Sequence, residues 1–76
     1  MKPGIQSYNH LNEIILNIIK SSDREISAAQ INDMILNRYR TGKIHTSARS
    51  ISQRTHAIFG IETIVGRPNK FVYAGD

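Results

Sequence analysis

The chain has 76 residues, of which 39% are hydrophobic and 21% charged, a composition that fits one globular domain and excludes a disordered tail or a bilayer span. It has no cysteine, which excludes disulfides and thiolate metal sites and favours a reducing, cytoplasmic location. The formal net charge of +4 is unevenly placed, because residues 38–70 hold seven bases and one acid whereas residues 1–37 hold three bases and four acids.

The first periodic segment predicts a helix over about residues 8–21, with Ser7 or Asn9 as its N-cap. The apolar residues at helical spacing are Leu11, Ile14, Ile15 and Ile18. Leu16 and Ile19 widen this apolar arc beyond what one core-facing stripe needs. We therefore expect either a neighbouring element or a second subunit to cover them.

A second helix is predicted over about residues 28–40. Ser27 and Gln30 have the spacing of a capping box, which marks its start, and Gly42 suits the left-handed stop after its end. Ile31, Met34 and Ile35 keep the helical spacing of a buried stripe. The preceding "EIS" is too short to be more than a stub of strand.

The segment "TSARSISQRTHAIFG" predicts a third helix over about residues 47–59, capped by Thr46 or Ser47 and ended by Gly60. Its apolar stripe is narrow and consists of Ala48, Ile51, Thr55 and Ile58. At about 100° per residue, the opposite side presents polar residues. They are Arg49, Ser50 and Gln53, with Arg54 and His56 beside them.

The last segment changes period and predicts a β-hairpin over about residues 61–74. Ile61, Thr63 and Val65 alternate with other side chains, and "GRPN" is a turn signal. Arg67 and Lys70 fall at the tip of this hairpin.

Three helices, a short stub between the first two, and a final hairpin resemble the winged helix-turn-helix superfamily, in particular small regulators of prokaryotes and their viruses. The residues that carry the likeness are "INDMILNRYRTGKIHTSARSISQRTHAIFGIE" and "TIVGRPNKFVYAG". The resemblance implies a single α+β winged-helix domain over residues 1–76, a three-helix bundle with a β-hairpin wing.

In such proteins the third helix enters the major groove of double-stranded DNA, and the wing touches the adjacent backbone or minor groove. The residues that match those positions are Arg49, Ser50, Gln53 and Arg54 on the helix and Arg67, Asn69 and Lys70 at the wing. Arg49 and Gln53 are the candidates for base readout, because Arg pairs with guanine and Gln with adenine. Lys43, Thr46 and Ser47 suit a phosphate.

We therefore expect a DNA-binding transcriptional regulator, acting as a homodimer through the first helix, with no cofactor and no small-molecule substrate. We expect no catalytic activity, because His10, His45 and His56 lie on three different elements without metal-ligand spacing. Two alternatives remain open. One is a winged-helix module that docks on another protein through the apolar arc of the first helix, and the other is a non-specific architectural DNA binder.

Overall fold

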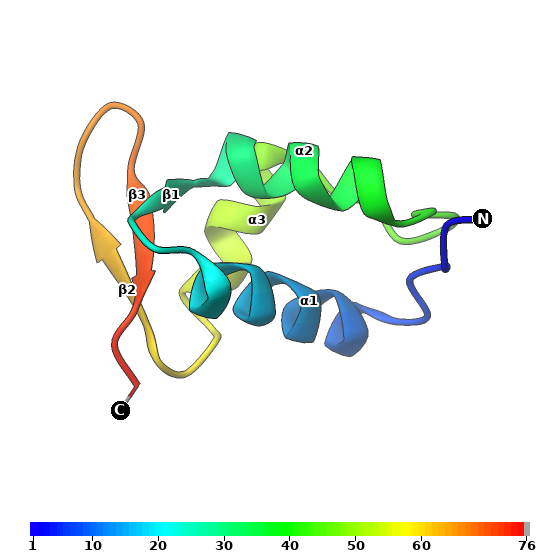
Figure 1. The fold of residues 1–76 in the computed structure, drawn as a ribbon, viewed down its shortest axis with the longest axis horizontal. Coiled ribbons are helices and arrows are strands. Elements are labelled where there is room, and N and C mark those ends of the chain that lie inside the picture. Colours follow the sequence, from blue (N-terminus) through cyan, green and yellow to red (C-terminus); the bar gives the residue numbers. More distant parts are fainter. Residues whose placement is uncertain (76) are drawn as a thin grey trace.

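The computed structural model describes residues 1–75 and has an α+β fold, with three helices beside one small antiparallel sheet (Figure 1). The elements are α1 (Tyr8–Ser21), β1 (Ile26–Ser27), α2 (Ala28–Arg38), α3 (Ala48–Thr55), β2 (Ile61–Ile64) and β3 (Lys70–Tyr73). The sheet stands at one end of the helices, and the N-terminal segment lies at the other end in this view.

Each helix begins at a serine that caps its first turn, as the sequence predicts. Ser7 Oγ accepts a hydrogen bond from the His10 N–H at 3.1 Å. At the start of α2, the predicted capping box is confirmed: Ser27 Oγ accepts from the Gln30 N–H, and Gln30 Oε1 accepts from the Ser27 N–H. These side chains satisfy amides that the helix itself leaves without partners.

α2 ends at Arg38, two residues before the predicted end at about residue 40. Tyr39 is extended, and Arg40 pairs with the N-terminal segment in a parallel bridge to Gly4. The Arg40 N–H donates to the Pro3 carbonyl at 2.9 Å, and the Ile5 N–H donates to the Arg40 carbonyl at 2.9 Å. These two bonds hold the backbone extended where the helical period alone would continue.

The predicted end of the third helix at residue 59 is wrong, because α3 ends at Thr55. The next residues form tighter turns, in which the Ala57 N–H donates to the Arg54 carbonyl and the Ile58 N–H to the Thr55 carbonyl. Gly60 has the predicted positive φ, at +94°, and its carbonyl accepts from the Ala74 N–H at 2.7 Å. The chain thus reverses into β2 at Gly60.

The sheet has the order β1-β3-β2, with both pairs antiparallel. The predicted hairpin is present as β2 and β3, joined by a loop over residues 65–69, here called the wing loop. The predicted stub pairs with β3, so that Ile26 lies opposite Phe71 and Ser27 opposite Lys70. Because β3 is central, it ties the hairpin to the start of α2.

The core lies between the three helices and the inner face of the sheet. Its buried residues are Ile5, Leu11, Ile14, Ile15, Ile18, Ile19, Ile26, Ile31, Ile35, Ile51 and Phe71. Ile19 is only 2% exposed and Leu16 is partly buried, because α1 packs against β3 as well as against α2 and α3. The surplus apolar surface that suggested a dimer through the first helix is therefore covered within the chain.

Candidate nucleic-acid interface

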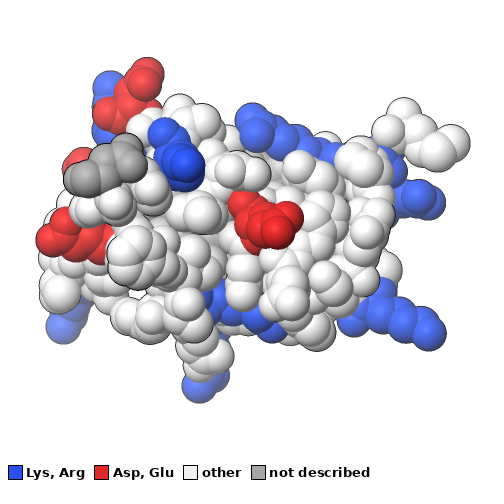
Figure 2. Space-filling view, turned by 90° about the horizontal axis from the view of Figure 1, so that it is seen from below, with Lys and Arg blue, Asp and Glu red and all other residues white. Residues whose placement is uncertain are grey.

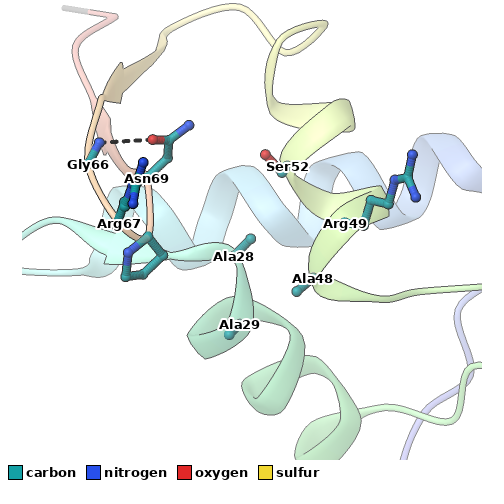
Figure 3. Close-up of a pocket in the computed structure, with 9 residues that line it drawn as sticks. Ala28, Ala29, Ala48, Arg49, Ser52, Gly66, Arg67 and Asn69 are labelled. Carbon is teal, nitrogen blue, oxygen red and sulfur yellow. Dashed lines mark hydrogen bonds between the residues drawn. The ribbon is translucent and has the colours of Figure 1, made fainter.

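An open groove of about 550 Å³ separates the first turns of α2 and α3 from the wing loop. We call it the α3–loop groove. Three alanines, Ala28, Ala29 and Ala48, line it on the helix side, and the wing loop lines the other (Figure 3). Arg49 lines it on the helix side and Arg67 on the loop side. Two cations from elements far apart in the sequence therefore border one hollow with a floor of small side chains.

The position of Arg49 follows from the way α3 begins. Ser47 and Ser50 form a reciprocal capping box, in which the Ser50 N–H donates to Ser47 Oγ at 3.2 Å and the Ser47 N–H donates to Ser50 Oγ at 2.9 Å. Upstream, Thr46 Oγ1 donates to Asn32 Oδ1 of α2 at 3.0 Å. These bonds fix the first turn of α3 against α2, so Arg49 leaves the helix at a defined place.

The same bonds change the roles of three predicted site residues. Thr46 gives its hydroxyl proton to Asn32, and Ser50 gives its own to the Ser47 carbonyl at 3.1 Å. Ser47 Oγ is held at the cap by the Ser50 amide. Thr46, Ser47 and Ser50 therefore stabilise the start of α3. The sequence predicted a capping role only for Thr46 or Ser47, as alternatives.

Arg49 and Gln53 lie four residues apart on α3, and both are exposed, which places them on the same face of the helix. Figure 3 shows the Arg49 side chain projecting from α3 on the side away from the wing loop. Ser52, one residue before Gln53, lines the α3–loop groove. This face of α3 is the polar, solvent-facing side that the helical period predicts.

Arg54 lies elsewhere, although the sequence grouped it with Arg49. Its guanidinium carbon is 4.2 Å from the centroid of the Tyr8 ring, and its Nη1 donates to Asn12 Oδ1 of α1 at 3.3 Å. Arg54 is accordingly half-buried. It joins α3 to α1 and is not part of the α3–loop groove.

The wing loop is closed by a side chain that the sequence assigned to binding. Asn69 Oδ1 accepts from the Gly66 N–H at 2.9 Å, the bond drawn dashed in Figure 3. Arg67, between these two residues, is exposed. Asn69 thus shapes the turn from which Arg67 projects.

Lys70 and Lys43 are exposed but do not line the α3–loop groove. Side chains alternate along a strand, and Phe71 faces the core, so Lys70 points to the outer side of the sheet. There it borders a smaller hollow of about 300 Å³ together with Glu25. Lys43 belongs to the turn between α2 and α3. Of the predicted cations, the groove brings together Arg49 and Arg67.

The face of the molecule that carries α1 differs in charge from the surface around the α3–loop groove. Figure 2 shows this face with acidic side chains near its middle and at one end, whereas Lys and Arg lie mostly around the margin. The helix itself carries Glu13 and Lys20, and Lys20 Nζ is 4.9 Å from the centroid of the Tyr73 ring. This face is therefore not a continuous basic surface.

Sequence reasoning missed the alanine floor of the groove and the N-terminal segment. Ala28 and Ala48 each follow a serine cap, so a small residue at the first position of two neighbouring helices was the available signal. Lys2 Nζ donates to the Leu36 carbonyl at 3.0 Å, a contact between residues 34 positions apart that no local pattern indicates.

Comparisons of the chain with protein-family models, with curated proteins and with solved structures find no match. Within residues 1–75, no helix has the length and apolar character needed to cross a membrane. In the same residues, no three side chains of His, Asp or Glu gather as a metal site.

Proposed function

We propose that the chain is a winged-helix protein that binds double-stranded DNA, with α3 in the major groove and the wing loop against the neighbouring backbone or minor groove. The element order supports this proposal, as does the sheet order β1-β3-β2, in which the stub before α2 pairs with the hairpin. Both features put the wing loop beside the start of α3. We further propose that the chain acts as a small transcriptional regulator.

The observation that carries the proposal is that Arg49 and Arg67, from elements far apart in the sequence, both line one open groove. DNA presents a ridge of phosphates beside each groove, and cationic side chains that contact these phosphates hold a protein in position for base readout. The small side chains of Ala28, Ala29 and Ala48 leave room for such a ridge between the helices and the wing loop. Seven of the ten bases of the chain lie in residues 38–70, which include both arginines.

The exposed face of α3 supplies the chemistry for sequence preference. Arg49 is long enough to form a fork of hydrogen bonds with O6 and N7 of guanine, and Gln53 to pair with N6 and N7 of adenine. Arg67 and Lys43 are suited to phosphates, which position the protein without reading sequence. Arg54 has no part in this contact, because it is engaged with Tyr8 and Asn12.

Titration of a duplex selected from a random pool tests the proposal at two salt concentrations. We expect affinity to fall as salt rises, and Arg49→Ala to weaken binding by about fivefold or more, since one bidentate base contact contributes about 1–3 kcal/mol. Arg24→Ala is the matched control, because it removes the same charge from an exposed residue in a separate hollow between α1 and β3. Equal effects of the two substitutions, or affinity independent of salt, would contradict the proposal.

Unrelated duplexes distinguish sequence-preferring from architectural binding. A regulator should prefer the selected duplex, and Gln53→Ala should reduce that preference. Equal affinity for all duplexes, with a steep salt dependence, would favour the architectural alternative. The burial of Leu11, Ile15 and Ile19 within the chain supports DNA binding over the alternative of a docking module that uses α1.

A further inference from the structure

β2 is an edge strand with an unused row of backbone groups. Within residues 1–75 it pairs with β3 and no other strand, and Figure 1 shows it at the outer margin of the sheet. The Gly60 carbonyl accepts a hydrogen bond from the N–H of Ala74, the residue that follows β3. Because hydrogen-bonded pairs alternate in an antiparallel ladder, Glu62 and Ile64 also turn their backbone groups toward β3. Ile61, Thr63 and Val65 therefore turn theirs outward.

Exposed apolar side chains stand at both ends of this edge. Phe59 is 90% exposed just before β2, and Val65 is 87% exposed just after it. Ile64, the last residue of the strand, is 43% exposed. An open edge flanked by apolar side chains is a template for pairing with another strand, and natural proteins usually protect such edges.

We propose that a second copy of this chain pairs with β2 across a twofold axis, antiparallel, with Thr63 opposite Thr63 of the second copy. A twofold axis normal to the sheet keeps the inner faces of both sheets on one side, so residues of the same face must meet. In this register the outward backbone groups of Ile61 meet those of Val65 from the other copy. Each exposed Phe59 end then lies beside a Val65 end.

Charge selects this register over its neighbour. A shift of the second copy by two residues would set Glu62 directly opposite Glu62, and like charges at opposite positions destabilise a sheet. In the proposed register Glu62 instead lies opposite Ile64 of the second copy. Lys70 pairs with Ile64 on the far side of that strand, about 10 Å from Glu62 across two strand spacings. That separation is within reach of a long lysine and a glutamate that share one face.

A second copy fits this edge because the edge complements itself, and the pairing is independent of the proposed DNA contact. None of the four residues of β2 lines the α3–loop groove. Strand pairing over about five residues buries less than the roughly 1,200 Å² of a standard stable interface. We therefore expect a weak dimer that depends on concentration.

A single engineered cysteine tests the register, because the chain has no other. In Thr63→Cys the two Cα atoms would stand about 5.5 Å apart, which a disulfide spans. Glu62→Cys is the matched control, since its two Cα atoms would lie about 8 Å apart, an offset of two residues and one strand spacing. We expect at least tenfold more disulfide-linked dimer from Thr63→Cys on mild oxidation of the full chain without DNA. Equal yields from the two variants, a yield from Thr63→Cys that is the same in urea as in buffer, or a higher yield from Glu62→Cys would overturn the proposal.

Sedimentation equilibrium of the unmodified chain gives a second readout. Thr63→Pro removes an outward N–H that β3 does not use, so the hairpin should persist while the dimer weakens at least tenfold. Circular dichroism checks that this variant folds. Val65→Lys, at a side chain that is 87% exposed, serves the same purpose without altering the strand and should weaken the dimer likewise. An unmodified chain that stays monomeric at millimolar concentrations would refute the proposed dimer.

Discussion

The guanidinium carbon of Arg54 stands 4.2 Å from the centroid of the Tyr8 ring, which joins the last turn of α3 to the first turn of α1. Tyr8 is 41% exposed and its hydroxyl accepts from the His45 N–H at 3.4 Å. The ring therefore contacts both α3 and the turn that precedes it. This contact fixes the side of α3 that faces α1, whereas the side that lines the α3–loop groove remains open.

We predict that Arg54→Ala lowers the free energy of unfolding by about 1 kcal/mol, because a cation–π contact of this exposure contributes about 0.5–1 kcal/mol and the bond to Asn12 is lost as well. Arg49→Ala, at an exposed position, should change stability by less than about 0.5 kcal/mol. Urea unfolding of both variants measures the difference. A larger loss from Arg49→Ala would contradict the assignment of Arg54 to the scaffold.

The two arginines show how far the sequence predicts the site. Arg49 was placed correctly on the exposed side of α3, because its direction depends only on the helical turn and on Ile51 facing the core. Arg54 was grouped with it, because a helical period does not indicate that Tyr8, 46 residues earlier, lies within contact distance. Local spacing predicts faces of elements, whereas partners across the fold depend on tertiary packing.

The fold itself was largely predictable where local chemistry decides it. The Ser27–Gln30 capping box located the start of α2, and the positive φ of Gly60 was expected from its position. The end of α2 was not predictable, because Arg40 is held extended by backbone bonds to Pro3 and Ile5 at the far end of the sequence. The burial of Ile19 depends in the same way on packing against β3.

Ser47→Ala should destabilise the protein by about 1 kcal/mol, with a range of about 0.5–2 kcal/mol for loss of a helix cap. Because α3 has only eight residues, its first turn is a large part of the helix. Loss of the bond from the Ser50 amide weakens that turn. Ser52→Ala is the control, because alanine raises helix propensity at an interior position. Thermal unfolding of the two variants should show a lower midpoint for Ser47→Ala alone. A normal midpoint for that variant would mean that the cap contributes little.

The two glycines of positive φ allow a matched comparison. Gly42 has φ +58° with no atom within 4 Å of an added Cβ, so Gly42→Ala should cost only the backbone term of about 1–2 kcal/mol. Gly60 has φ +94°, and an added Cβ would lie 2.8 Å from Cε1 of Tyr73. Gly60→Ala should therefore cost about 3 kcal/mol, since displacement of the ring adds about 1–3 kcal/mol. Equal losses on denaturant unfolding would show that the Tyr73 ring moves aside freely.

Arg67 and Gln53 should differ in kind as DNA contacts, because one projects from the wing loop and the other from the exposed face of α3. If Arg67 neutralises one phosphate, Arg67→Ala should weaken binding to all duplexes alike and reduce the slope of log affinity against log salt by about one. Gln53→Ala should leave that slope unchanged and lower the preference at one base pair by about 1–3 kcal/mol. Titrations of both variants against the selected duplex and a single-base variant of it, at three salt concentrations, separate the two effects. A loss of base preference in Arg67→Ala, or a change of slope in Gln53→Ala, would reverse the proposed roles of α3 and the wing loop.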